Sequence, residues 1–226
     1  MEVLLIRHTS VAVPPGTCYG QTDVAVADTF EQEAAVTKQT LQQYGAIEKA
    51  YSSPLTRARK LAAYCGYPDA ETDPRLLEMA MGDWEMRRYE EISDPYIKEW
   101  YNDYLHLPTP NGESFMDQRQ RVSAFLDELR TKPYRRVAIF AHGGVLACAA
   151  IYGGLYAMEA AWDNLTPTSQ RICPPVIPGR PTSPYIRTRY ILHLKKIRKS
   201  DVFAYFCINI VKKHYLCTLK LINSSS

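Results

Sequence analysis

Residues 135–155 read RRVAIFAHGGVLACAAIYGGL, and this stretch decides the fold class. Its run VAIFA at 137–141 is short and apolar, which predicts a strand buried on both faces of a sheet. Gly143 and Gly144 then turn the chain into an apolar segment with the length of a helix. A buried strand that leads through a glycine turn into a helix is typical of an α/β domain.

Outward from this stretch, the same alternation of strand-like and helix-like segments recurs. VLLI at 3–6 and IEKAY at 47–51 predict two further strands. Residues 30–44 have apolar side chains at helical spacing, as do residues 55–62. Strands that alternate with helices in this way predict a mostly parallel sheet.

Two helix starts are marked by their capping residues. We expect one helix to begin with Ser53 as its N-cap and Pro54 at its first position. Another is expected to begin at Ser114, where Asp117 three residues later completes a capping box.

The composition limits the class of protein. The chain has 226 residues, 46% hydrophobic and 23% charged, which suits a folded domain and excludes collagen-like, coiled-coil and disordered chains. No apolar run reaches the ~18–20 residues of a membrane span, and the start MEVLLIRH lacks the basic region of a signal peptide. The six cysteines show no metal-ligand spacing, so we expect free thiols, no bound metal and a cytoplasmic protein.

The charge divides the chain into two segments. Residues 1–168 carry a net charge of −7, whereas residues 169–226 carry +10 with a single acidic residue, Asp201. This change predicts a domain boundary near Thr168. Because the basic charge is confined to one end, the overall excess of +3 does not indicate a nucleic-acid-binding protein.

Three strand ends carry side chains suited to phosphate. The first predicted strand ends in Arg7 and His8, the second leads to Arg57, and VAIFA ends in His142. Ligand sites of open α/β sheets form beyond the carboxyl ends of the strands, and arginines and helix N-termini both bind phosphate. Each residue alone is compatible with a structural role, but their convergence favours a phosphate site, with Gly143 as a further substrate-binding residue.

Five stretches together resemble the histidine phosphatase superfamily, the phosphoglycerate-mutase-like proteins. They occur in the family's order: LLIRHTS (4–10), YSSPLTRARKLA (51–62), LLEMAMGDWE (76–85), NGESF (111–115) and VAIFAHGGV (137–145). The resemblance implies a three-layer α/β/α sandwich with a mostly parallel central sheet. Within the superfamily, PPGTCYGQTDV (14–24) and NLTP (164–167) are similar to the α-ribazole phosphatases of cobalamin nucleotide-loop assembly.

The resemblance also implies roles for single residues. The nucleophile and its phosphate-binding partners fall on His8, Arg7, Arg57 and His142. Glu78 falls where the family has its proton donor. Thr9 is a departure, since most members have glycine directly after the nucleophilic histidine, and this puts the main-chain contacts of that loop in doubt.

These residue types suit phosphoryl transfer without a metal or any other cofactor. A neutral imidazole can attack phosphorus and form a phosphohistidine, provided that its other ring nitrogen donates to a backbone carbonyl. Arg7, Arg57 and a protonated His142 would hold the three equatorial oxygens of the phosphoryl group. Glu78 would protonate the leaving alkoxide and then activate water.

Several assignments stay open on the sequence alone. Asp83 and Glu85 are alternatives to Glu78 as the acid, although a surface carboxylate is the favoured interpretation of Glu85. Helix capping explains Ser114 and Glu113, with substrate contact by Glu113 as the alternative.

Substrate choice is expected to reside in two places. Tyr96, Trp100 and Tyr104 fall at helical spacing, which predicts a core-facing stripe, with an aromatic wall against a benzimidazole as the alternative. Tyr19 and Gln21, just beyond the phosphate loop, are candidates for contact with the ribose.

The basic segment has no match to the family. Residues 168–185 are rich in proline and predict a linker, and the stretches after them are β-branched and aromatic. The alternatives are a membrane anchor, a basic arm, or an aberrant chain end without a function. We expect most of it to be mobile, unless a stretch such as Tyr190–Leu194 pairs with the edge of the sheet.

The sequence thus predicts a phosphomonoesterase that forms a phosphohistidine, most simply on α-ribazole 5′-phosphate. A broad small-molecule phosphatase or a phosphoglycerate mutase on the same scaffold is the first alternative, and an inactive phosphate-binding module is the second. The expected partner is a small phosphate monoester, with neither nucleic acid nor membrane.

Overall fold

The opening stretch forms the strand β4 (Arg136–Ala141) and the helix α5 (Gly143–Tyr152). A computed structural model describes residues 1–154, 157–158, 207–211 and 214–220. Residues 137–141 of β4 are fully buried, because the strand lies inside the sheet with neighbours on both sides. The prediction of a buried strand that runs through a glycine turn into an apolar helix is therefore confirmed.

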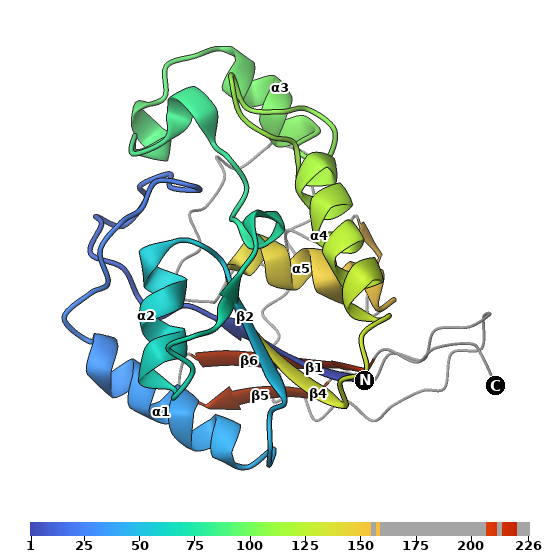
Figure 1. The fold of residues 1–226 in the computed structure, drawn as a ribbon. Coiled ribbons are helices and arrows are strands. Elements are labelled where there is room, and N and C mark those ends of the chain that lie inside the picture. The colour runs from blue at the N-terminus through green and yellow to red at the C-terminus, as the bar shows by residue number, and fades with distance from the viewer. Residues whose placement is uncertain (155–156, 159–206, 212–213, 221–226) are drawn as a thin grey trace.

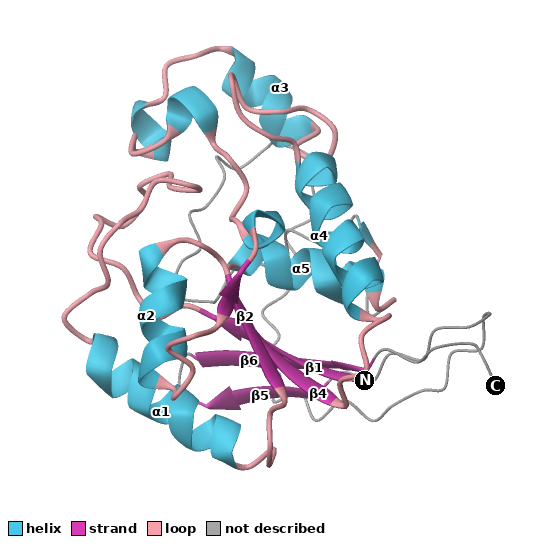
Figure 2. Ribbon diagram, in the orientation of Figure 1, coloured by secondary structure: helices cyan, strands magenta, loops and turns pink. Residues whose placement is uncertain are grey.

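The sheet has the strand order β3-β2-β4-β1-β6-β5. Four of these strands run parallel, namely β1 (Glu2–Arg7), β2 (Lys49–Ser52), β3 (Glu71–Thr72) and β4. The strand β6 (His214–Lys220) pairs antiparallel with β1, and β5 (Cys207–Val211) pairs antiparallel with β6 (Figure 2). The sheet is mostly parallel, as predicted.

Two helical layers cover the sheet. On one face lie α1 (Phe30–Gln42) and α2 (Thr56–Tyr64), and on the other lie α4 (Phe115–Leu129) and α5 (Figure 1). Side chains of a strand alternate between faces, so Leu4 and Ile6 join the first layer whereas Val3 and Leu5 join the second. The predicted three-layer α/β/α sandwich is confirmed.

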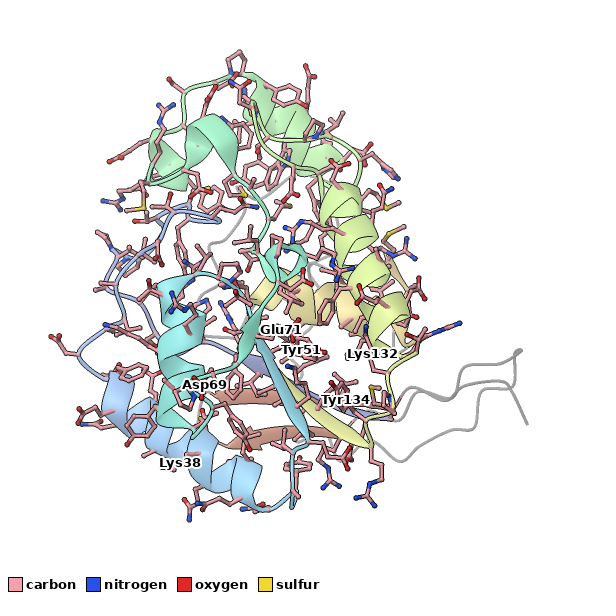
Figure 3. All side chains as sticks on the ribbon, viewed as in Figure 1. Lys38, Tyr51, Asp69, Glu71, Lys132 and Tyr134 are labelled. Carbon is pink, nitrogen blue, oxygen red and sulfur yellow. The ribbon has the colours of Figure 1, made fainter. Side chains whose placement is uncertain are left out.

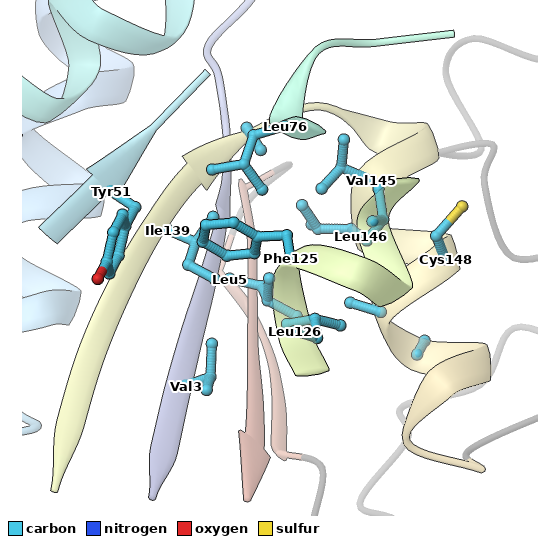
Figure 4. Close-up of a cluster of buried hydrophobic side chains, with 14 of the residues drawn as sticks. Val3, Leu5, Tyr51, Leu76, Phe125, Leu126, Ile139, Val145, Leu146 and Cys148 are labelled. Atoms are coloured by element: carbon cyan, nitrogen blue, oxygen red, sulfur yellow. The ribbon is translucent and has the colours of Figure 1, made fainter. Parts of the chain in front are cut away.

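The larger hydrophobic core lies between the sheet and α4 with α5. Figure 4 shows Phe125 of α4 packed beside Ile139 of β4 and Leu5 of β1, with Tyr51 of β2 in the same cluster. The rings of Tyr51 and Phe125 meet edge to face at a centroid distance of 5.3 Å. Burying a large apolar side chain contributes about 1.5–3 kcal/mol to folding. The two cores together therefore stabilise the central strands of the sheet.

The edge strand β3 is short and exposed. Its Glu71 is the register partner of Tyr51 on β2, and the two lie side by side in Figure 3. Glu71 also forms a 2.7 Å ion pair with Lys49. Charged side chains on a short edge strand discourage pairing with other chains.

The two helix starts turned out differently. At α4, Ser114 and Asp117 form the expected capping box. At α2, the helix begins at Thr56 rather than at Pro54, and Ser53 Oγ accepts only a 3.3 Å hydrogen bond from Leu55 N. The prediction of Ser53 as N-cap was wrong, because a distant carboxylate caps this helix.

The distant cap is Asp23. Its Oδ1 accepts a 2.8 Å hydrogen bond from Thr56 N, and its Oδ2 accepts from the Thr56 hydroxyl. A carboxylate at a helix N-terminus satisfies free N–H groups and complements the helix dipole. The cap thus ties the loop around residue 23 to α2.

Beyond one end of the sheet lies a smaller aromatic cluster. It includes η2 (Gly82–Trp84), η3 (Tyr89–Glu91) and α3 (Tyr96–Asn102), while η1 (Pro74–Leu76) packs below it against α4. Trp84 and Trp100 are each 1% exposed and meet edge to face at 5.4 Å. Tyr96 and Tyr104 pack against the same cluster, so the helical stripe is a core stripe, as predicted.

The basic segment contributes β5 and β6 to the sheet, where β6 pairs with β1 and β5 pairs with β6. Tyr190–Leu194, the linker and the proposed boundary at Thr168 lie outside the described residues, and the boundary stays a prediction.

Two further features concern the cysteines and the helices. Cys18, Cys65 and Cys148 are free and buried, and burial raises the pKa of Cys18 and of Cys65 to about 12. Within the described ranges, no helix is both long and apolar enough to cross a membrane.

Candidate active site

Three adjacent strands end at the same edge of the sheet and place the site. His8 follows β1, Ser53 follows β2 and His142 follows β4. Main-chain hydrogen bonds extend the sheet to these residues, from His8 N to Ala141 O at 3.0 Å and from Ser53 N to Phe140 O at 2.8 Å. The two histidines therefore lie side by side, with ring centroids 5.2 Å apart.

His8 is held in one tautomer. Its Nδ1 lies 2.6 Å from the main-chain oxygen of Thr9, so Nδ1 carries the proton and Nε2 keeps its lone pair. Burial lowers the pKa of His8 well below 6.5, and His142, Arg7 and Arg57 lower it further. The imidazole is therefore neutral, and its Nε2 has the free lone pair that a nucleophile requires.

His142 lies opposite and is fully buried. Its Nε2 is 2.7 Å from Ser53 Oγ. Burial lowers the pKa of His142 well below 6.5, and the positive charges of Arg57 and Arg7 act in the same direction. A neutral His142 is therefore favoured in this site, since a further positive charge beside two arginines is unfavourable, and the expected protonated His142 of the phosphate complex stays a prediction.

Arg57 lies on the second residue of α2 and is fully buried. Its Nη2 donates to Gly20 O at 2.6 Å and its Nη1 donates to Thr22 O at 2.9 Å. Its guanidinium also lies over the ring of Tyr19, 5.4 Å from the centroid. Arg57 therefore places positive charge beside His8 and holds the loop that carries Tyr19.

The expected substrate-contacting residues of that loop differ in their availability. The Tyr19 phenol is hydrogen-bonded to Arg7, and burial raises its pKa. Gln21 uses its Nε2 to donate to Glu78 O at 3.0 Å. Tyr19 thus lies beside Arg7 and Arg57, whereas Gln21 holds the loop against the main chain of Glu78.

Three buried polar atoms around His8 have no hydrogen-bond partner among the described residues. They are Thr9 Oγ1, Arg57 Nε and His142 Nδ1. Buried polar groups of folded proteins are nearly always paired, and leaving one unpaired costs about 1–3 kcal/mol. Such atoms beside a neutral imidazole and two guanidinium groups suit a polyvalent anion.

Glu78 reaches the site from the loop after η1. Its Oε1 accepts from Gln118 Nε2 at 2.9 Å and from Met79 N at 3.0 Å, and its Oε2 accepts from Gly144 N at 3.2 Å. Gly144 is the second residue of α5, so its hydrogen bond places the Glu78 carboxyl at the start of the helix that follows His142. Gly143, the first residue of α5, lies between His142 and Gly144.

The two alternative acids have other partners. Asp83 is exposed and accepts from Asn111 Nδ2 at 2.9 Å. Glu85 is half-buried and accepts main-chain hydrogen bonds from residues 20, 21, 22 and 81, together with the Thr22 hydroxyl. The interpretation of Glu85 as a surface carboxylate was wrong, because it organises the loop beside the site.

The hydrogen bonds to Glu85 also favour its charged form. Burial opposes the charged form, but the hydrogen bonds that this carboxylate accepts outweigh burial and lower the pKa of Glu85 below its ordinary value of 4.5. Gly20 allows this close approach, since a Cβ atom there would lie 1.9 Å from Met79 O and 2.8 Å from Glu85 Oε1. An ionised Glu85 therefore holds the loop near neutral pH.

Glu113 is also engaged within the protein. Its Oε1 accepts from Arg121 Nε at 2.8 Å, and its Oε2 accepts from Ala80 N and Arg121 Nη2, each at 2.9 Å. Ser114 caps α4 as predicted. These contacts account for Glu113 without substrate.

Sequence reasoning missed the residues that hold the loop of Glu78. Arg121 donates to the main-chain oxygens of residues 75, 77 and 78, and Gln118 donates to the Glu78 carboxyl. Gln118 does carry a signal, because it is a polar residue in the apolar stripe that continues from Phe115 to Val122. Within the described ranges, no group of three or more His, Cys, Asp and Glu side chains is arranged to hold a metal ion.

Comparisons with known proteins fit this geometry. The family model of the histidine phosphatase superfamily (branch 1) matches residues 3–170. The adenosylcobalamin/alpha-ribazole phosphatase of Salmonella typhimurium is 27% identical over 166 residues, which cover 65% of this chain and 76% of that protein. The protein of the same name from Escherichia coli is 36% identical over 78 residues, 33% of this chain and 38% of that protein.

Solved structures agree with this likeness. The crystal structure of a phosphoglycerate mutase from Thermus thermophilus has a TM-score of 0.56 at 31% identity and covers 66% of this chain and 81% of that chain. The chain spans less than two thirds of the length of two of the curated relatives that it matches, the Escherichia coli protein among them.

Proposed function

The chain belongs to the histidine phosphatase superfamily, and from that premise we propose that it hydrolyses phosphate monoesters through a phosphohistidine on His8. The observation that carries the proposal is the surroundings of His8. A neutral, buried imidazole with its Nε2 lone pair available faces two arginines and several unpartnered polar atoms. A phosphate monoester would supply the negative charge and the acceptor oxygens that this arrangement lacks.

The first half of the reaction forms the phosphoenzyme. His8 Nε2 attacks phosphorus in line with the ester oxygen, so that an N–P bond forms while the P–O bond breaks. The electron pair of that bond goes to the leaving alkoxide, which takes a proton from Glu78. Arg7 and Arg57 offset the charge of the equatorial oxygens, so the proposed reaction requires no metal ion.

The second half regenerates the enzyme. Glu78, now a carboxylate, takes a proton from water as the water oxygen bonds to phosphorus and the N–P bond breaks. Glu78 can serve both halves because its hydrogen bond to Gly144 holds its carboxyl at the start of the helix that follows His142. General acid–base help of this kind contributes ~10²–10⁴-fold in rate.

His142 takes part as a hydrogen-bond donor. Ser53 Oγ accepts from Leu55 N, which leaves the Ser53 hydrogen to donate to His142 Nε2. The His142 proton is then on Nδ1, the nitrogen without a partner among the described residues. A neutral His142 can therefore donate to a phosphate oxygen in place of the protonated form.

We propose α-ribazole 5′-phosphate as the substrate. The two relatives described above carry the name adenosylcobalamin/alpha-ribazole phosphatase, and Tyr19 lies beside the two arginines that we propose to bind the phosphate. The similarity to a phosphoglycerate mutase supports a second candidate, a mutase or a phosphatase of small phosphorylated acids on the same scaffold.

The mechanism is tested by trapping the phosphoenzyme. After acid quench of the protein with ³²P-labelled α-ribazole phosphate, we expect base-stable, acid-labile label on His8, and none in the His8→Ala variant. Turnover should continue in excess EDTA. An inactive phosphate-binding module would retain phosphate without forming label, and activity that EDTA abolishes and Mg²⁺ restores would refute the metal-free mechanism.

The substrate is tested by comparing specificity constants. We expect kcat/KM for α-ribazole phosphate to exceed that for 3-phosphoglycerate by at least ~10²-fold, since the nucleoside offers apolar contacts, to Tyr19 above all, that a small acid lacks and that are worth a few kcal/mol. Transfer of the phosphoryl group between positions of a phosphoglycerate, rather than to water, would favour the mutase. Equal constants for both esters would leave only the broad phosphatase.

A further inference from the structure

The amide of Gln118 lies against the Glu78 carboxyl in the interior of the protein. Gln118 is fully buried on α4, and its Nε2 donates to Glu78 Oε1 at 2.9 Å. Its Oε1 is buried as well and has no hydrogen-bond partner in the described part of the chain. An unpaired buried acceptor is costly, so its presence next to an ionisable group needs a reason.

The space around this pair is reserved for it. A Cβ atom at Gly144 would lie 2.3 Å from Glu78 Oε1, 2.4 Å from Gln118 Oε1 and 2.7 Å from Gln118 Nε2. Any side chain at Gly144 would therefore displace the carboxyl and both ends of the amide. A glycine is thus required at position 144 because the Glu78 carboxyl and both ends of the Gln118 amide pack against it, in addition to its place in the turn into α5.

One end of the amide suits both protonation states of Glu78. Nε2 donates to Glu78 Oε1 when the carboxyl is ionised, as in the structure. A carboxylic acid keeps an acceptor oxygen, so the same bond remains when the proton is on Oε2, from which it can go to a leaving group. The unpaired Oε1 of Gln118 is the cost of holding the amide in this place.

Other charged groups around Glu78 do not take over this task. Arg57 of α2 interacts with the Glu78 charge, and Arg121 of α4 donates to the Glu78 main-chain oxygen. Of these three side chains, only that of Gln118 donates a hydrogen bond to the carboxyl itself.

We propose that Gln118 is a positioning residue for Glu78, one whose Nε2 holds Glu78 Oε1 both in the carboxylate and in the acid, so that Oε2 carries and delivers the proton. The inference rests on the proposed function, in which Glu78 changes its protonation state twice in each turnover. A residue that matches both states keeps the carboxyl in place through both halves of the reaction.

The test uses the leaving group. An alkyl phosphate needs a proton on its leaving oxygen, whereas p-nitrophenyl phosphate releases a stable phenolate without one. For the full-length protein, kcat/KM reports the steps through release of the alcohol. We expect Gln118→Met to lower kcat/KM about 10–100-fold for the alkyl ester, as a part of the general-acid contribution, and less than about 3-fold for the aryl ester.

Matched controls separate this role from a structural one. Gln120→Met makes the same change on the exposed face of α4 and should alter neither constant. Glu78→Gln should show the same selective loss, and the double variant Glu78→Gln/Gln118→Met should lose no more than Glu78→Gln alone, because Gln118 acts through Glu78. If Gln118→Met folds poorly, Gln118→Asn withdraws the amide by one methylene and should give the same selectivity.

The outcomes of this test are distinct. Selective loss on the alkyl ester and no added loss in the double variant support the proposal. Equal losses on both esters, no loss in a folded Gln118 variant, or additive losses in the double variant overturn it. A wild-type protein that hydrolyses neither ester refutes the proposed function itself, before any variant is compared.

Discussion

The two halves of the candidate site are held by different means. The strand-end half consists of His8, Ser53 and His142, which main-chain hydrogen bonds and two hydrophobic cores place at the ends of buried strands. The loop half consists of Tyr19, Gln21 and Glu78, which partly buried carboxylates, arginines and amides hold in place. The strand-end half depends on packing, whereas the loop half depends on charge and on hydrogen bonds.

The difference indicates that the two halves respond differently to pH and to substitution. Apolar packing is indifferent to pH, so the strand-end half is expected to keep its geometry wherever the domain is folded. The loop half depends on the ionisation of Glu85 and Glu113, and each bond joins segments that are far apart in the chain. Substitutions at the residues that join the two halves are therefore expected to disturb both of them.

Arg57 joins the halves directly, so its removal should have the largest effect. Arg57→Ala deletes a charge beside His8 and two bonds to the loop, and we expect kcat/KM to fall ~10³-fold or more, since one transition-state donor contributes ~10²–10³-fold. Arg57→Lys keeps the charge but not the paired bonds and should recover only part of the activity. Steady-state kinetics on one phosphate ester would measure both variants, and equal activity of Arg57→Ala and wild type would contradict the shared role.

Substitution of Glu85 tests the loop half alone, through the pH dependence of the free energy of unfolding. Its folded pKa lies below 4.5, so its contribution to stability is complete above the unfolded pKa and is lost as the pH falls through the folded pKa. Glu85→Gln cannot accept from all of these donors and should lower the free energy of unfolding at pH 7 by about 1–2 kcal/mol. Urea unfolding from pH 7 down to pH 3 should show a smaller pH dependence in the variant, and parallel curves would refute this account.

Ser53 tests the strand-end half with the smallest change. Ser53→Ala removes the partner of His142 Nε2 and should lower kcat/KM about 10-fold, the equivalent of one hydrogen bond, through loss of the tautomer that donates from Nδ1. The KM for the ester should change less than kcat. Binding of inorganic phosphate by calorimetry serves as the check, since unchanged binding and unchanged kinetics together would show that Ser53 does not direct the tautomer.

The strand-end half could be predicted because a buried strand is recognisable in the sequence as a short apolar run. VAIFA and VLLI are apolar runs whose ends fall at His142 and Arg7, and the sheet brings these ends together by its parallel order. The resemblance then supplied the roles. What failed was local capping, since Asp23 caps α2 from a loop that no short-range pattern connects to Thr56.

The loop half could be predicted only in part. Spacing alone did not separate Glu78 from Asp83 and Glu85, because the distinction lies in partners more than thirty residues away along the chain. Gln118 could have been suspected, as an amide in an apolar helical stripe has to find a buried partner. Which partner it finds depends on tertiary structure.

The cap that Asp23 places on α2 couples two parts of the molecule that are distant in the chain. Any displacement of residues 20–23 removes this cap and also breaks the bonds from Arg57 to Gly20 and Thr22. At about 1 kcal/mol for the cap and a similar amount for each hydrogen bond, such a displacement costs about 3 kcal/mol. The loop and the first turn of the helix that carries Arg57 should therefore behave as one cooperative unit in hydrogen exchange.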